Sequence, residues 1–152
     1  MGSPSILLVD DSPTDGALIL RALASVVPPD QVAVCTDGLA ALDFLFCRGS
    51  HSGRNPADLP SVVVLDLNLP RVSGMDVLRE IRANERTRLL PVAILSGAGS
   101  PADVATAIRL GANSFIRKAD EFEEFSRRVV LLARYWLDIN IPATALTERR
   151  EQ

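Results

Sequence analysis

The sequence predicts one α/β domain with a doubly wound parallel β-sheet and helices on both faces. Five short apolar runs, rich in Val and Ile, recur along the chain with helical stretches between them. Four of these runs are nearly continuous rather than alternating, which is typical of strands buried on both faces of a parallel sheet. The length of 152 residues fits one domain, and the 47% of apolar residues are enough for one packed core.

The predicted strands are residues 5–9, 31–35, 61–65, 91–95 and 114–117. The second run alternates between apolar and polar residues, so we expect it at an edge of the sheet. Strands that alternate with helices imply right-handed crossovers, and the commonest small fold of this kind is the flavodoxin-like (βα)5 fold with strand order 2-1-3-4-5. In such a fold the functional site is expected at the carboxyl ends of the strands.

The first predicted helix has a clear start signal. Ser12 is a good N-cap, Pro13 fits the first helical position, and Asp15 completes a capping box. This helix is predicted to end near Val27, before two prolines. Further helices are predicted over residues 39–47, 74–84, 101–110 and 121–137, each closed by Gly, Pro or a polar cluster.

The last predicted helix carries two apolar faces. The residues with helical spacing that should face the sheet are Phe122, Phe125, Val129, Leu132 and Trp136. A second apolar set lies outside that stripe and continues past the helix: Val130, Leu131, Tyr135, Leu137, Ile139 and Ile141. Such a face predicts a contact surface. A homodimer is the preferred interpretation, and a tail that folds back over its own domain is the alternative.

Residues 48–60 form a polar stretch rich in Gly, Ser, Pro and Asn, which predicts a long surface loop. Residues 1–142 are therefore expected to form the domain, including this loop, and residues 143–152 a C-terminal tail. His51, the only histidine, lies in the loop without a companion ligand and is interpreted as a solvated side chain.

Composition excludes several classes of partner. With 16 Lys and Arg against 19 Asp and Glu, the net charge is -3, so we expect no attachment to nucleic acid or to an anionic membrane surface. The longest apolar runs, residues 62–65 and 129–133, are far shorter than the roughly 18 residues of a membrane span. Cys35 and Cys47 lack a CxxC spacing, so they predict reduced thiols in a cytoplasmic protein.

Polar residues follow or end four of the five predicted strands. Asp10 and Asp11 follow the first strand, Asp66 the third, Ser96 the fourth and Lys118 the fifth. Parallel strands bring these ends to one edge, where clustered carboxylates need a cation, and oxygen ligands in this number suit Mg²⁺. Three carboxylates, one lysine and one Mg²⁺ then sum to zero charge. Taken singly, the acids also fit ordinary helix-end and turn positions.

This cluster suits phosphoryl transfer to a carboxylate, with Asp66 as the nucleophile. Mg²⁺ and Lys118 would screen the charge of the incoming group, and the Ser96 hydroxyl or nearby backbone N–H groups would bind its oxygens. A phosphatase of the haloacid-dehalogenase type needs an acid two residues after the nucleophile, where Asn68 stands. A flavin carrier needs a phosphate cradle where Asp10 and Asp11 stand, and these would repel the phosphate.

Four segments carry a family resemblance: residues 9–12 (Val-Asp-Asp-Ser), 65–70 (Leu-Asp-Leu-Asn-Leu-Pro) followed by Gly74, 94–97 (Ile-Leu-Ser-Gly) and 115–118 (Phe-Ile-Arg-Lys). Over nearly its whole length the chain resembles a response-regulator receiver domain. The resemblance implies that Asp66 accepts a phosphoryl group from a partner histidine kinase. It also implies a Mg²⁺ site, with ligands from Asp10, Asp11, Asp66 and the Asn68 main-chain carbonyl, and a phosphoryl site at Lys118 and Ser96.

The resemblance further implies a switch, in which the Ser96 hydroxyl moves toward the phosphoryl group and the Phe115 ring packs inward. Signalling would use the face of the fourth helix, fifth strand and fifth helix. Two positions depart from the family pattern. Ala119 replaces the usual proline, which leaves the isomer of the preceding peptide open. Phe115 replaces tyrosine, so switching is expected to rest on packing alone.

The expected protein is a phosphoacceptor in signalling rather than an enzyme in the usual sense, limited to phosphorylation from a donor and self-dephosphorylation. The alternative is a receiver-like interaction module that works without phosphorylation. The loop at residues 48–60 and the ending at residues 133–142 are similar to those of stand-alone regulators paired with bacterial phytochromes. That narrower resemblance implies a light-sensing histidine kinase upstream, a homodimer and no output domain.

Overall fold

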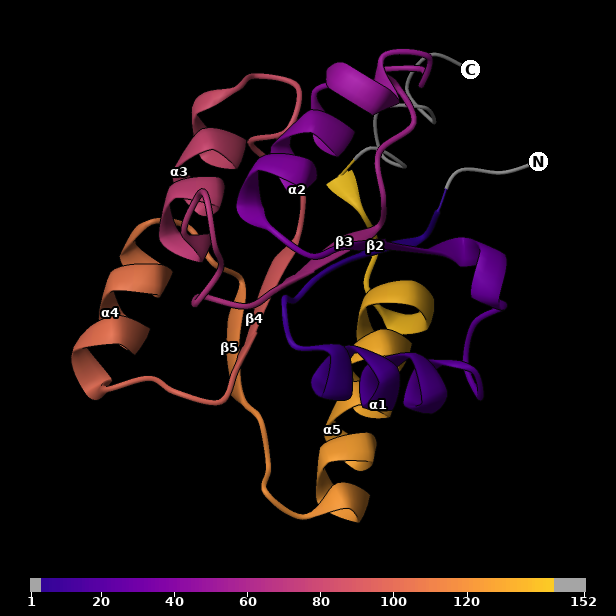
Figure 1. Cartoon of the computed structure of the whole chain (residues 1–152), viewed down its shortest axis with the longest axis vertical. Coiled ribbons are helices and arrows are strands. Elements are labelled where there is room, and N and C mark those ends of the chain that lie inside the picture. Colours follow the sequence, from indigo (N-terminus) through magenta and orange to yellow (C-terminus); the bar gives the residue numbers. More distant parts are fainter. Residues whose placement is uncertain (1–3, 144–152) are drawn as a thin grey trace.

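The computed structural model describes residues 4–143 and confirms the predicted architecture (Figure 1). Its five parallel strands are β1 (Ile6–Val9), β2 (Val32–Cys35), β3 (Val62–Leu65), β4 (Val92–Ser96) and β5 (Ser114–Arg117). They form one sheet in the order β2-β1-β3-β4-β5. As expected, β2 lies at an edge, and Val34 within it is 45% exposed.

The helices follow the strands in regular alternation. They are α1 (Pro13–Leu23), α2 (Gly38–Leu45), α3 (Gly74–Ala83), α4 (Pro101–Arg109) and α5 (Phe122–Arg134). Two short 3-10 turns, Pro29–Gln31 and Gly49–His51, lie in connections, and a π-helical turn, Tyr135–Ile139, continues α5. Two predicted ends were therefore wrong: α1 ends at Leu23 rather than near Val27, and the last helix changes its winding at Tyr135.

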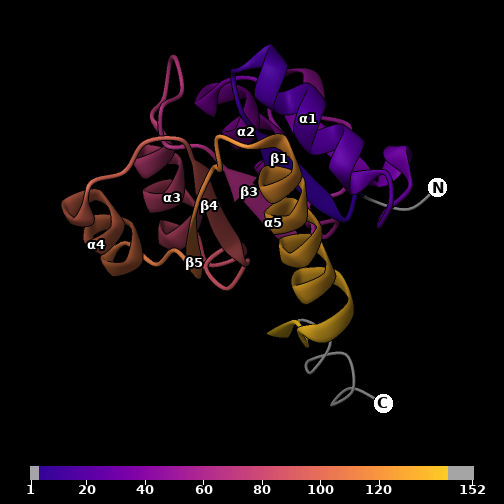
Figure 2. The same cartoon turned by 90° about the horizontal axis from the view of Figure 1, so that it is seen from below.

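Two apolar layers explain why the strand sequences are nearly continuous. Alternate strand residues point to opposite faces. On one face Leu7, Val63 and Ile94 pack with α2, α3 and Ala107 of α4. On the other face Leu8, Val64 and Leu95 pack with α1 and α5, which lie side by side in Figure 2. Every residue of β1 and β3 is buried because helices cover both faces of the sheet.

The buried stripe of α5 matches the prediction only in part. Phe125, Val129 and Leu132 are buried and Trp136 packs against the core, as expected. Phe122, at the first helical position, is 44% exposed instead, and its ring lies 5.6 Å from the guanidinium carbon of Arg21.

The second apolar face of the last helix is smaller than predicted. Val130 and Leu137, assigned to the contact surface, pack partly buried against the core. Leu137 does so because the helix phase shifts where the π turn begins at Tyr135. The remaining candidates are exposed: Leu131 52%, Tyr135 48%, Ile139 68% and Ile141 71%. Of the predicted tail, only Ala143 lies within the described residues.

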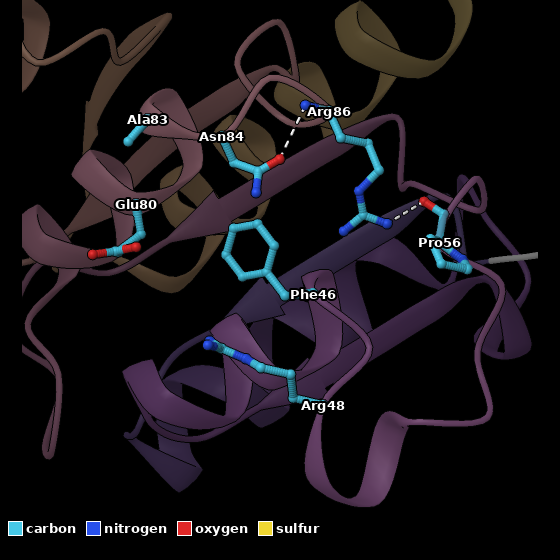
Figure 3. A pocket seen from close by; sticks show the side chains of 7 residues that line it. All are labelled: Phe46, Arg48, Pro56, Glu80, Ala83, Asn84 and Arg86. Carbon is cyan, nitrogen blue, oxygen red and sulfur yellow. Dashed lines mark hydrogen bonds between the residues drawn. The ribbon is translucent and has the colours of Figure 1, made fainter.

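The long loop between α2 and β3 is held by arginines that bind backbone carbonyls. Arg86 donates to the carbonyls of Pro56 and Leu45, and Arg54 to those of Phe44 and Asp58. Figure 3 shows Phe46 between the side chains of Arg48 and Arg86, in an open hollow of about 520 Å³. The residues that line this hollow come from the ends of α2 and α3 and from the loop before β3. The hollow therefore lies on the side of the sheet where the strands begin, opposite their carboxyl ends.

Three further observations concern the cysteines, the lengths of the helices and His51. Cys35 and Cys47 are free thiols, and burial, with a contribution from Asp37, raises the pKa of Cys35 to about 11. Within residues 4–143, no helix combines the length and the apolar character needed to cross a bilayer. His51 contacts Phe44 edge-on, with 5.2 Å between ring centroids.

Candidate functional site

Strand register brings the predicted polar residues to one edge of the sheet. Val9, the last residue of β1, pairs with Leu65 of β3, and Ser96 of β4 pairs with Arg117 of β5. The residues that follow these ends, Asp10 and Asp66, are only 4% and 7% exposed, and Ser96 is completely buried. Clustering of these side chains, predicted from the sequence, is therefore what the fold produces.

Three carboxylates form a group with metal-ligand spacing. One oxygen from each of Asp10, Asp11 and Asp66 lies within 4.8 Å of the others. Hard oxygen donors with an exposed member, here Asp11, suit Mg²⁺ that retains part of its water shell. The donors present therefore fit the predicted cation. The Asn68 N–H donates to Asp66 Oδ1 at 3.3 Å, which puts this backbone segment beside the acceptor, while the ligand role of the Asn68 carbonyl stays a prediction.

Lys118 is the cation of the site. Its Nζ lies 2.7 Å from Asp10 Oδ2, 2.8 Å from Asp15 Oδ2 and 3.3 Å from Asp66 Oδ2, and its side chain is 9% exposed. Burial lowers the pKa of Lys118, but the hydrogen bonds to Asp10 and Asp15 and the charge of Asp66 outweigh burial and raise the pKa above its ordinary value. Lys118 therefore remains an ammonium.

Asp10 is the most constrained carboxylate. Burial raises its pKa, and the hydrogen bonds from Lys118 and from the Ser12 N–H, the latter 2.9 Å from Asp10 Oδ1, oppose that effect. A buried carboxylate with a raised pKa gains from an added positive charge nearby. This electrostatic balance favours cation binding at the strand ends.

Asp15 belongs to the site, which the sequence interpretation missed. Ser12 caps α1 as predicted, with its Oγ accepting from the Asp15 N–H at 3.2 Å. The second half of the predicted capping box is wrong, because the Asp15 carboxylate turns to Lys118 and the Ser12 N–H binds Asp10. With four carboxylates, one ammonium and one divalent cation, the formal charge is -1 rather than the predicted zero.

Ser96 has a buried hydroxyl without a hydrogen-bond partner anywhere in residues 4–143. Leaving such a group unpaired costs about 1–3 kcal/mol. A neighbouring cavity of about 230 Å³ is lined by Asn68 and Ser73 from the loop after β3 and by Ala98 and Asp103 after β4. The hydroxyl is thus available to a ligand oxygen that enters at the strand ends.

Phe115 and Arg117 both contact the loop after β4. Gly99 in this loop has φ of +151°, and a Cβ there would lie 2.8 Å from the Phe115 ring, so only glycine allows this approach. Arg117 Nη2 donates to the Gly99 carbonyl at 2.6 Å. An arginine therefore supplies this loop with a hydrogen bond that Phe115 cannot make, and the expectation that switching rests on packing alone stays a prediction.

Backbone contacts fix the two loops that carry Asp66 and Lys118. A Cβ on Gly74 would lie 2.2 Å from the Asp66 carbonyl oxygen, so the start of α3 can approach the acceptor loop only as glycine. The Lys118 N–H donates to the Ser96 carbonyl at 2.8 Å. All peptide bonds in the described chain are trans, including the bond before Ala119, whose isomer the sequence left open.

Comparison with known proteins agrees with this geometry. The family model for the response regulator receiver domain matches residues 6–130. The chain is 38% identical over 135 residues to the probable methanogenesis regulatory protein FilR2 of Methanothrix harundinacea, covering 89% of this chain and 84% of that protein. It is 31% identical over 139 residues to response regulator Rcp1 of Synechocystis sp., covering 91% and 92% of the two chains.

Solved structures give the same result. The Mn²⁺-bound form of Rcp1 matches with a TM-score of 0.83 at 29% identity, over 93% of this chain and 99% of that one. The phosphorylated cyanobacterial phytochrome response regulator RcpA matches with a TM-score of 0.85 at 29% identity, with the same coverage. In fold and in sequence, the chain belongs to the response-regulator receiver domain family, and it is similar to the phytochrome-associated stand-alone regulators.

Proposed function

We propose that the chain is a stand-alone response regulator that accepts a phosphoryl group on Asp66 from a phosphohistidine of a sensor histidine kinase. One observation carries the proposal: Lys118 Nζ lies 3.3 Å from Asp66 Oδ2, and the Lys118 N–H binds the carbonyl of Ser96, whose hydroxyl is unpaired in the described chain. An ammonium and a free hydroxyl flanking a buried carboxylate are the groups that a phosphorylated aspartate needs. The phosphorylated state in which RcpA was solved supports the same assignment.

In the proposed reaction an Asp66 carboxylate oxygen attacks phosphorus, a P–O bond forms, and the P–N bond to the donor imidazole breaks. The imidazole leaves with its electron pair and takes up a proton from solvent. Lys118 binds a phosphoryl oxygen and offsets its negative charge, while the Ser96 hydroxyl donates to another. Mg²⁺, held by Asp10, Asp11, Asp66 and the Asn68 carbonyl, would supply further charge screening for the transferred group.

The proposed signal leaves through α4, β5 and α5. When Ser96 turns toward the phosphoryl group, the Phe115 ring, which is partly buried against the core, would pack further inward. Gly99 would move together with the Phe115 ring, because Phe115 and Arg117 both contact Gly99. Phosphorylation at Asp66 would thus change the surface around α4.

Two partners are proposed. The upstream partner is a light-sensing histidine kinase of the phytochrome class, which the similarity to RcpA supports.

The second proposed partner is another copy of the chain. The exposed Leu131 and Tyr135 border an apolar hollow with Ile116 and Trp136, and we propose that this hollow of one copy packs against the same hollow of the other. We expect Leu131→Glu to give the monomer mass by light scattering, and a wild-type chain that is already monomeric would contradict the dimer.

The proposed phosphorylation is tested by intact mass spectrometry after incubation with a small acyl phosphate and Mg²⁺. We expect the wild-type chain to gain one phosphoryl group and Asp66→Asn to gain none. A gain that survives Asp66→Asn would assign another acceptor. A wild-type chain that gains nothing would favour the interaction module that works without phosphorylation.

A further inference from the structure

The sequence Ser-Pro-x-Asp occurs twice at a helix start, at residues 12–15 and 100–103, with different outcomes. At α4 the full capping box forms, with Ser100 Oγ accepting from the Asp103 N–H and Asp103 Oδ2 accepting from the Ser100 N–H, both at 3.1 Å. At α1 the Asp15 carboxylate leaves this local arrangement and binds Lys118, which is 103 residues away in sequence. The Lys118 ammonium therefore outcompetes the local cap.

Lys118 has no donor left for a new ligand in this arrangement. An ammonium carries three protons, and three carboxylates already accept from it. Asp66 is itself the proposed acceptor, so its contact at 3.3 Å passes to the phosphoryl group, and a further phosphoryl oxygen can reach Lys118 only if Asp10 or Asp15 withdraws. Asp10 and Asp66 have side chains that are 2% and 8% exposed, whereas the Asp15 side chain is 36% exposed and can regain water. Asp15 is thus the ligand that Lys118 releases at the lowest desolvation cost.

We propose that Asp15 is a positioning residue that holds the Lys118 ammonium toward α1 in the unphosphorylated protein and competes with the phosphoryl group for it. This inference rests on the proposed phosphorylation of Asp66. Asp15 is not one of the three carboxylates with metal-ligand spacing, but its negative charge lies at the same edge. It therefore favours the cation and disfavours the anion at one site.

The two ligands should respond to loss of this charge in opposite directions. Asp15→Asn keeps the backbone N–H that Ser12 caps, so α1 retains its start. For a partly exposed charge, we expect Mg²⁺ to bind about threefold to tenfold more weakly and beryllofluoride, a phosphoryl analogue, about threefold to tenfold more tightly. Both changes should shrink in high salt.

The test is calorimetric titration of the full chain, first with Mg²⁺ alone and then with beryllofluoride at saturating Mg²⁺. The matched control is Asp76→Asn, because Asp76 holds the same position in α3, with Ser73 Oγ accepting from its N–H at 3.2 Å and its carboxylate on the exposed Arg79. We expect this control to change both affinities by less than about twofold. Asp15→Glu, which keeps the charge, should lie between the wild-type chain and Asp15→Asn.

The outcomes separate the two claims. Opposite shifts for the two ligands in Asp15→Asn support the positioning role. Affinities equal to those of Asp76→Asn, or a parallel weakening of both ligands, overturn it, since the latter is what a damaged helix start would give. A wild-type chain that binds Mg²⁺ but no beryllofluoride, and gains no phosphoryl group, overturns the proposed function itself.

Discussion

Charged side chains gather at both edges of the sheet, the one where the strands end and the one where they begin, but they bind different groups at the two places. At the carboxyl ends of the strands, Lys118 binds carboxylates, and Ser96 Oγ is unpaired. At the opposite edge, arginines bind backbone carbonyls. Arg82 alone donates to the carbonyls of Gly111, Leu90 and Arg88 and to the Asn113 side chain.

This contrast separates a binding site from structural support. A guanidinium that binds carbonyls joins chain segments and leaves no donor for a ligand. A cluster of like charges with an unpaired hydroxyl is incomplete until an ion or a phosphoryl group arrives. The arginines at the amino-end edge should therefore support folding, whereas Lys118, its carboxylate partners and Ser96 at the carboxyl-end edge should support ligand binding at little benefit to folding.

Arg82→Met should have the largest effect on stability. It leaves the partly buried carbonyls of Gly111 and Leu90 without this donor, which we expect to cost about 2–3 kcal/mol in the free energy of unfolding. Urea denaturation measures this cost, and Arg79→Met, on the same helix at an exposed ion pair, is the control with a change below about 0.5 kcal/mol. Phosphorylation should survive in both variants. Equal stability of the two would remove the contrast between the edges.

Thr87→Val should have a smaller effect at the same edge. Thr87 is completely buried, and its hydroxyl donates to the Ile81 carbonyl at 2.7 Å. Valine has nearly the same shape, so the expected loss is that of one hydrogen bond, about 1 kcal/mol by urea denaturation. A variant as stable as the wild-type chain would show that this bond contributes nothing to folding.

Ser96→Ala should not lower the free energy of unfolding as Thr87→Val does. Its hydroxyl is just as buried as that of Thr87 but has no partner in the described chain, so its removal should leave stability unchanged or raise it by up to about 1 kcal/mol. Beryllofluoride affinity should nevertheless fall, because one donor to the analogue is lost. Destabilisation comparable to that of Thr87→Val would mean that the hydroxyl is structural.

The smallest expected effect at neutral pH is a difference in reactivity between the two cysteines. Cys35 ends β2, and its pKa of about 11 in the folded chain lies above the ordinary value of 9.0. Folding therefore favours the neutral thiol, and its contribution to stability is constant below about pH 9 and falls as the pH rises toward 11. Iodoacetamide at pH 8 should modify the less buried Cys47 first, as peptide mass spectrometry would detect. Faster modification of Cys35 would contradict its protected state.

Local sequence patterns were sufficient for the fold and for most of the site. Apolar runs determine which strands are buried on both faces. Parallel strands bring Asp10, Asp66 and Lys118 to one edge of the sheet, whatever the conformation of the loops that connect the strands. The role of Asp15 was not predictable in this way, because the same Ser-Pro-x-Asp pattern gives a complete capping box at Ser100. Only the proximity of Lys118 in the fold distinguishes the two helix starts.

The end of α5 shows the same limit. Helical periodicity located Phe125, Val129 and Leu132 in the core, but it assumes constant winding. The π turn at Tyr135–Ile139 changes the phase, so Leu137 packs inward although the pattern predicted it outside. The hydrogen bond from Arg117 to the Gly99 carbonyl was missed for a related reason, since it depends on a loop conformation with positive φ.

The most direct test of the central claim maps the acceptor itself. Borohydride reduction converts an aspartyl phosphate to homoserine, so the modified position can be read by peptide sequencing after incubation with acyl phosphate and Mg²⁺. We predict homoserine at position 66 and at no other carboxylate, with none formed when Mg²⁺ is removed. Homoserine at Asp10, Asp11 or Asp15, or none at all in the presence of Mg²⁺, would contradict the assignment of Asp66 as the phosphoacceptor.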